Sequence, residues 1–260
     1  MESIQVRTAD GVRLTGVTLP TAGELAFVLC HGFTVSTRRP VVRRIAERLA
    51  RSGGVVALDF RGHGGSGGRC TVGDLEVLDV DAAVAYARAR GYARVVTVGF
   101  SMGGGVVVRH AAGAPTAAGV APVERVDAVV SVSAPSRWRI RDTPPMRRVH
   151  WLLVSRSGRI VASSLMRTRI GRWTADPETP VEVAGRIPPT PLLVVHGGRD
   201  AYLGLEHARD LVAAAGKAEL WELPDFGHAE GAATPDLVDR IAGWAAAATA
   251  DGPPAGTMRP

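Results

Sequence analysis

A serine lies between two glycines in the pentapeptide GFSMG at residues 99–103, after the β-branched run VVTV at 95–98 and before further small residues. This order predicts a strand, a sharp turn and the start of a helix. A serine hydroxyl is a poor nucleophile at neutral pH, so it must stand clear of the backbone and beside a base. The G-x-S-x-G turn presents it in this way, because only glycine fits on either side of so tight a bend. We therefore interpret Ser101 as a catalytic nucleophile.

Two later loops carry the partners that such a serine needs, in the order acid then histidine. Asp200 follows one predicted strand, 192–196, and His228 follows the next, 218–223. The histidine can take the serine proton, while the carboxylate orients the imidazole and stabilises its charged form. Asp225 and Glu230 are rival acids, but they lie only three and two residues from His228 and are poorly placed for this role. We predict a triad of Ser101, Asp200 and His228.

Acyl transfer builds negative charge on a carbonyl oxygen, so two backbone N–H groups must already point at it. The N–H of Met102, next after the nucleophile, is expected to be one of them. The loop after the dipeptide 31–32 (His-Gly) is expected to supply the other, from Phe33. An ordinary tight turn is the alternative interpretation of that dipeptide. A glycine-rich stretch at 59–66 should pass beneath the site, and we interpret its polar residues as structural: Asp59, Arg61 and His63.

These residues follow predicted strands that alternate with predicted helices. The expected strands are 3–8, 12–19, 25–30, 55–60, 94–100, 126–133, 192–196 and 218–223, and the expected helices are 40–51, 75–90, 102–112, 205–215 and 235–248. Such alternation predicts a parallel sheet covered by helices on both faces. The turn signal Asp10-Gly11 adds an antiparallel hairpin at one edge. The fold class is therefore α/β, with a mostly parallel sheet.

The alternation stops between residues 136 and 187. From Arg137 to Arg172 the chain holds ten arginines and one acidic residue, Asp142, although its formal net charge is only +6. A connection of this length should be functional or separately organised. We interpret 136–187 as an arginine-rich lid (cap) inserted into a core formed by 1–135 and 188–250. A Pro/Gly-rich tail, 251–260, is expected to be disordered.

The apolar residues of this lid are candidates for lining a substrate pocket, although packing of the lid onto the core explains them equally well. They are Trp138, Trp151, Leu152, Leu153, Leu165, Met166 and Trp173. For the arginines, a solvated face is the default interpretation. The alternatives are an anionic substrate, such as an acyl-CoA or acyl phosphate, and contact with an anionic membrane surface. Nucleic acid is not expected as a partner, because no recognition motif accompanies the charge.

Composition bounds the remaining classes. A chain of 260 residues with 46% hydrophobic residues can form one α/β domain. It holds no run of 18 apolar residues and no visible signal peptide, and its two cysteines, Cys30 and Cys70, form neither a disulfide framework nor a metal-ligand spacing. We expect a cytoplasmic protein without a bound metal.

Taken together, these motifs are similar to those of the α/β-hydrolase superfamily, over nearly the whole chain. The D-x-R-G-H-G-x-S stretch at 59–66 and the GFSMGG stretch at 99–104 most resemble its monoacylglycerol-lipase and serine-aminopeptidase-like branch. The resemblance implies an eight-stranded sheet, a serine nucleophile and no cofactor. It does not imply a substrate, since the same triad on this fold hydrolyses esters, thioesters and amides and also transfers acyl groups.

The leading functional hypothesis is a serine hydrolase that cleaves a carboxylic ester, lipid-like esters included, through an acyl-enzyme on Ser101. A thioesterase or acyltransferase acting on an acyl-CoA-like substrate is the near alternative. A non-turnover small-molecule receptor or scaffold on the same fold is an alternative of another class. Haloalkane dehalogenase and epoxide hydrolase chemistry is disfavoured, because both are expected to need a carboxylate at position 101.

Overall fold

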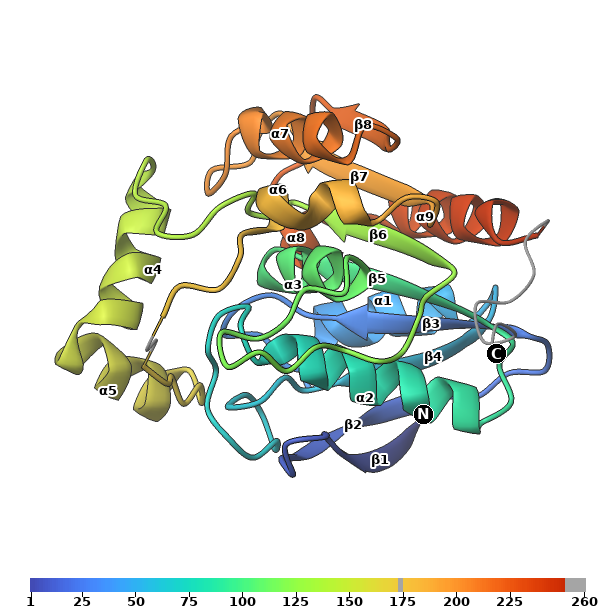
Figure 1. Cartoon of the computed structure of the whole chain (residues 1–260), viewed down its shortest axis with the longest axis horizontal. Helices are drawn as coiled ribbons and strands as arrows, with labels where there is room; N and C mark the ends of the chain where they lie inside the picture. The colour runs from blue at the N-terminus through green and yellow to red at the C-terminus, as the bar shows by residue number, and fades with distance from the viewer. Residues whose placement is uncertain (173–174, 251–260) are drawn as a thin grey trace.

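An eight-stranded sheet runs through the centre of the protein in a computed structural model that describes residues 1–172 and 175–250 (Figure 1). The strands are β1 (Glu2–Arg7), β2 (Arg13–Leu19), β3 (Leu25–Cys30), β4 (Gly54–Leu58), β5 (Arg94–Phe100), β6 (Ala128–Val132), β7 (Leu192–Gly197) and β8 (Glu219–Leu223). Their order across the sheet is β1-β2-β4-β3-β5-β6-β7-β8. The predicted α/β class and the eight strands are confirmed.

The sequence of each strand matches its place in the sheet. β3, β4, β6 and β7 are buried along their whole length, as expected for apolar strands of a parallel sheet covered on both faces. β1 and β2 instead pair antiparallel at one edge, and β2 also pairs antiparallel with β4. Their turn passes through Gly11, whose φ of 82° favours glycine. The predicted edge hairpin is therefore present.

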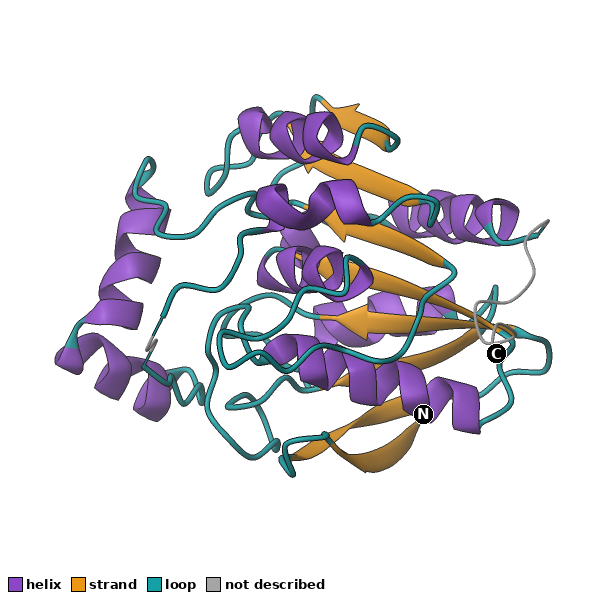
Figure 2. Ribbon diagram, in the orientation of Figure 1, coloured by secondary structure: helices purple, strands orange, loops and turns teal. Residues whose placement is uncertain are grey.

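Helices cover both faces of this sheet (Figure 2). α2 (Glu76–Ala89), α3 (Met102–Ala111) and α7 (Leu205–Ala215) contribute to one apolar layer, and α1 (Pro40–Leu49) and α9 (Pro235–Ala248) to the other. Proline at the first position starts α1 and α9, and the Thr234 side chain accepts a hydrogen bond from the Leu237 N–H at the start of α9. Gly216, with φ of 67°, ends α7.

A two-helix insert, residues 136–172, stands apart from the sheet on the left of Figure 1. It contains α4 (Pro144–Val154) and α5 (Arg156–Leu165), which pack against each other. Ser155 separates them and caps α5 by accepting the Gly158 N–H at 2.8 Å. Several apolar side chains of the insert are exposed: Trp151, Val154, Ile160, Leu165 and Met166. No helix among the described residues is long and apolar enough to span a bilayer.

The chain returns from the insert to the sheet through α6 (Pro180–Val183) and the 3-10 turn η1 (Ala184–Arg186). Both pack against α7, and α6 also packs against α3. This part of the predicted 136–187 segment thus contacts the sheet-covering helices. The predicted disordered tail, 251–260, and the pocket candidate Trp173 lie outside the described residues.

Candidate active site

Ser101 sits on a bend between β5 and α3, with φ of 50° and ψ of −118°. Its neighbours make this conformation possible. A Cβ atom at Gly99 would overlap the Gly103 carbonyl oxygen, and one at Gly103 would overlap the Cys30 carbonyl oxygen. The Ser101 N–H donates to the Val132 carbonyl of β6 at 2.8 Å. The bend therefore holds the serine hydroxyl at the carboxyl end of the central strands, as the motif predicts.

Two further loops bring an imidazole and a carboxylate to this hydroxyl. The Nε2 atom of His228 lies 3.0 Å from the Oγ atom of Ser101, and its Nδ1 atom lies 2.7 Å from the Oδ2 atom of Asp200. Asp200 follows β7, and His228 stands immediately before the one-turn helix α8 (Ala229–Ala232). The three predicted residues therefore meet in one hydrogen-bonded chain, although they come from three separate loops.

The carboxylate of Asp200 is fully enclosed and fully engaged. Its side chain has no exposed area, and its Oδ1 atom accepts the N–H groups of Tyr202 and Leu203 at 2.8 and 3.0 Å. Burial opposes ionisation, but the hydrogen bond and charge of His228, together with these N–H donors, outweigh it and lower the pKa of Asp200. The carboxylate is thus held charged and oriented toward the imidazole.

A tyrosine covers the imidazole. The ring of Tyr202 stacks on that of His228, with centroids 4.4 Å apart and planes inclined by 25°. The Tyr202 carbonyl oxygen also accepts a hydrogen bond of 2.9 Å from Thr143, the N-cap of α4. Sequence reasoning missed this residue, and its position two places after Asp200 was the available signal. Tyr202 links the insert to the loop that carries the acid.

In the loop after β3, the N–H groups on both sides of Phe33 donate hydrogen bonds. The Gly32 N–H donates to the Oε1 atom of Glu230 at 2.6 Å, and the Thr34 N–H donates to the Nε2 atom of His63 at 3.3 Å. Among the described residues, neither the Phe33 N–H nor the Met102 N–H has a hydrogen-bond acceptor. These two N–H groups are the ones predicted for the oxyanion.

Glu230 has a role in the geometry that its sequence position did not suggest. The sequence offers it only as a rival acid to Asp200, yet its carboxylate accepts the Gly32 N–H of the loop after β3 from across the site. It is buried, and it lines the same pocket as Ser101. A buried carboxylate bonded to a backbone N–H 198 residues away in sequence is a contact that only the tertiary structure reveals.

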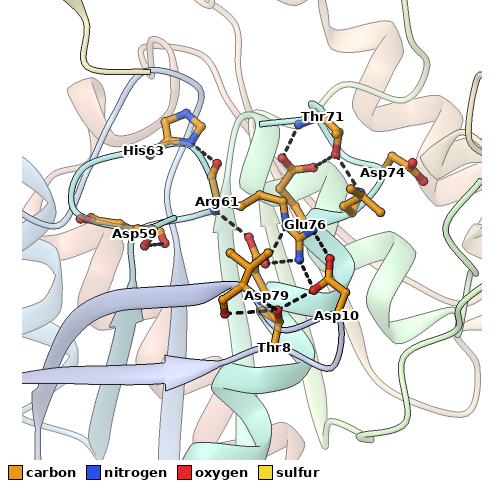
Figure 3. Close-up of polar contacts among 12 residues, drawn as sticks. Thr8, Asp10, Asp59, Arg61, His63, Thr71, Asp74, Glu76 and Asp79 are labelled. Atoms are coloured by element: carbon orange, nitrogen blue, oxygen red, sulfur yellow. Dashed lines mark hydrogen bonds and ion pairs between the residues drawn. The ribbon is translucent and has the colours of Figure 1, made fainter. Parts of the chain in front are cut away.

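Beneath this loop, the glycine-rich stretch 59–66 is fixed by a buried polar network (Figure 3). Arg61 donates to Asp79 through its backbone N–H, Nε and Nη2 atoms at 2.7–2.9 Å, and its Nη1 atom reaches Asp10 at 2.7 Å. Burial disfavours the guanidinium charge, but the carboxylates of Asp79 and Asp10 outweigh it and raise the pKa of Arg61. These contacts agree with the prediction that Arg61 has a structural role.

A cavity of about 590 Å³ opens over Ser101 and extends under the insert. Of the predicted lining residues, Trp138, Leu152, Leu153 and Met166 line it. Trp151 and Leu165 do not, and this part of the prediction is wrong. Both are exposed, because each lies one residue, or about 100° around a helix, from a neighbour that faces the cavity.

Comparisons with known proteins give one matching family and several solved structures of the same fold. The model of the family described as serine aminopeptidase, S33, matches residues 23–179. The matched region begins before β3, includes the Ser101 bend and ends after the insert. It therefore covers more than half of the chain.

Several solved structures share the fold over almost the entire chain. An esterase of Pyrococcus furiosus, Pf2001, superposes with a TM-score of 0.72 at 24% identity, covering 94% of this chain and 90% of its own. The α/β hydrolase GrgF of a Penicillium species gives 0.70 at 19% identity, covering 96% and 99%. The esterase RhEst1 of a Rhodococcus species gives 0.65 at 19% identity, covering 95% and 99%.

Proposed function

The chain belongs to the serine aminopeptidase S33 family of α/β hydrolases, and on that premise we propose that it hydrolyses carboxylic esters through an acyl-enzyme on Ser101. The observation that carries the proposal is the hydrogen-bonded chain Ser101–His228–Asp200, with distances of 3.0 and 2.7 Å. Two of the three proteins whose solved structures share this fold are described as esterases, which supports an ester as the substrate.

In the first step, the Oγ atom of Ser101 attacks the ester carbonyl while His228 takes the hydroxyl proton. The carbonyl carbon gains a bond to Oγ, and its π electron pair moves to the carbonyl oxygen. Asp200 stabilises the imidazolium that forms. Collapse of this intermediate breaks the bond to the leaving alkoxide, which receives the proton from His228. An acyl-enzyme and a free alcohol result.

In the second step, a water molecule takes the place of the alcohol. His228 removes a proton from it as it attacks the acyl carbon, and the proton then returns to Oγ. The products are a carboxylic acid and the free serine. In both steps the unbonded N–H groups of Phe33 and Met102 would hold the oxyanion, and groups preorganised in this way typically contribute about 10²–10³ in rate each.

The lining of the catalytic cavity supports an ester with apolar surface. The side chains of Phe33, Leu152, Leu153 and Met146 face it, together with Ile140. Apolar walls exclude water and strengthen the polar interactions at the reacting carbonyl. An ester that binds over Ser101 would therefore be desolvated as it enters this cavity.

A panel of p-nitrophenyl esters of increasing chain length tests the proposal. We expect sustained release of nitrophenol over many turnovers, and a loss of about 10³-fold or more in His228→Ala. A burst of about one equivalent without further release would contradict turnover and favour the receptor alternative. Hydrolysis of acyl thioesters in preference to esters of equal length would contradict the choice of substrate.

A further inference from the structure

A second cavity adjoins the catalytic one beneath the insert. Its volume is about 410 Å³, against about 590 Å³ for the first. Four residues line both cavities: Val72, Arg139, His150 and Leu153. These shared residues place the second cavity directly beside the one that opens over Ser101. The chemistry of the second cavity therefore bears on which substrate the first accepts.

The second cavity combines an apolar surface with several cationic groups. Its apolar residues include Leu153, Val154 and Ile170, and its arginines are Arg139, Arg159 and Arg172. None of the residues that line it in the described parts of the chain is acidic. An apolar cavity that collects positive charge without matching negative charge is suited to an amphipathic anion.

The acidic groups near the insert leave much of this charge uncompensated. Asp176 pairs with Arg139 at 2.7 Å. Arg159 donates instead to the uncharged carbonyl oxygens of Leu153 and Val154, at 3.2 and 3.0 Å, where α4 ends. Within residues 1–172 and 175–250, no acidic side chain forms an ion pair with Arg159 or Arg172.

His150, which lines both cavities, lies near the same positive charges. Burial lowers the pKa of His150, and the nearby charges of Arg141 and Arg139 lower it further. His150 therefore adds no further positive charge, and its ring donates or accepts a hydrogen bond as a neutral group. Any charge that the cavity binds favourably must be negative.

We propose that the second cavity binds an anionic group, a carboxylate or a phosphate, at the far end of the substrate. An apolar segment joins that group to the ester carbonyl at Ser101. Guanidinium groups match the two oxygens of such anions with paired N–H donors. This inference rests on the proposed ester hydrolysis and narrows it to esters that carry a terminal negative charge.

Matched substrates test this selectivity. Mono-p-nitrophenyl esters of dicarboxylic acids with six, eight and ten carbons are compared with methyl-terminated p-nitrophenyl esters of equal length. We expect kcat/KM of the charged ester to exceed that of the neutral ester at one chain length or more. The ratio should fall several-fold in 0.5 M NaCl, because salt screens partly exposed charges. The corresponding ω-phosphate esters show which of the two anions is preferred.

Charge-removing variants locate the effect. Arg159→Gln and Arg172→Gln are each expected to lower the charged-to-neutral ratio about threefold to tenfold. Arg156→Gln is the matched control, since Arg156 begins the same helix as Arg159, is exposed and lines neither cavity. An equal fall of the ratio in Arg156→Gln would overturn the proposal, because net charge rather than the cavity would then explain it.

Failure of this inference is distinct from failure of the proposed function. Hydrolysis of neutral esters with no preference for charged ones at any length would overturn the anionic site alone. Absence of hydrolysis of every ester would overturn the function on which it rests. Binding to phosphatidylglycerol vesicles that Arg159→Gln weakens, with ester selectivity unchanged, would assign these arginines to a lipid surface and would also overturn the proposal.

Discussion

Arginine occupies two opposite environments in this protein. In the glycine-rich stretch beneath the site, Arg61 has a side-chain exposure of 2% and contacts two carboxylates. In the insert above the site, Arg148 and Arg156 are exposed and form no ion pair among the described residues. A buried paired charge fixes a backbone in one conformation, while an exposed unpaired one has no protein partner to hold it.

The difference predicts how mutations in the two regions will act. Changes beneath the site should alter stability and the chemical step, because Asp59 and His63 accept hydrogen bonds from the loop after β3, which carries the Phe33 N–H. Changes in the insert should alter substrate choice and leave the stability of the fold nearly unchanged. Matched variants, one from each region, test this division.

The largest effect is expected at the buried acid. Asp200→Asn keeps the side-chain shape but removes the charge that stabilises the imidazolium, so kcat should fall about 10³- to 10⁴-fold, or roughly 4–5.5 kcal/mol. Ester turnover at saturating substrate measures it. The insert residue Asp142, which pairs with exposed Arg137 at 3.1 Å, gives the contrast. A similar loss of kcat in Asp142→Asn would break the division between the two regions.

Next comes the charge beneath the site. Arg61→Gln leaves the buried carboxylate of Asp79 uncompensated and should lower the free energy of unfolding by about 3–5 kcal/mol. Urea denaturation measures this change. The same substitution in the insert, Arg148→Gln, should change the free energy by no more than about 0.5 kcal/mol. Equal losses in the two variants would show that burial does not separate the two kinds of arginine.

The buried histidine of the same stretch predicts a pH effect. Burial, and then the neighbouring His31 ring, lower the pKa of His63 from the ordinary histidine value of 6.5 to about 3. Between these values the unfolded chain binds more protons than the folded one, so stability is complete above pH 6.5 and falls as the pH drops toward 3. His63→Gln should reduce this slope by about 1.4 kcal/mol per pH unit.

The matched control for that slope lies in the insert. His150→Gln removes a partly exposed histidine and should change the slope much less. Urea denaturation at several pH values between 4 and 6 gives both slopes. An unchanged slope in His63→Gln would mean that the His63 ring is not held neutral by the fold.

The smallest effect concerns the loop after β3, which carries the N–H groups of Gly32 and Phe33. Glu230→Ala removes the acceptor of the Gly32 N–H, and a buried donor left unpaired costs about 1–3 kcal/mol. Because the neighbouring Phe33 N–H then loses its fixed direction, we expect kcat to fall about tenfold to a hundredfold, with KM changing little. Glu230→Gln keeps an acceptor oxygen and should restore most of kcat. A fall in both variants alike would assign the effect to the charge instead of to the position of the loop.

Much of this architecture could be predicted from the sequence. Each expected strand and helix of the sheet region appears within a few residues of its predicted limits, because buried parallel strands and capped helices have strong local patterns. The Ser101 bend was predictable for the same reason, since its glycines are required by local backbone geometry.

What could not be predicted depends on contacts between distant segments. Nothing in the sequence around Glu230 indicates a bond to Gly32, and the position of Tyr202 two residues after Asp200 does not by itself indicate that its ring stacks on His228. The orientation of Trp151 and Leu165 was also missed, because apolar residues occur on more than one side of α4 and α5 and periodicity alone does not select the inner one. Positions set by tertiary packing are thus where the sequence is least informative.

The central claim is that the hydroxyl of Ser101 is a nucleophile activated by His228. Intact-mass measurement after treatment with a fluorophosphonate tests it most directly. One covalent adduct per chain is expected in the unaltered protein and none in Ser101→Ala. Labelling of Ser101→Ala at the rate of the unaltered protein would contradict it.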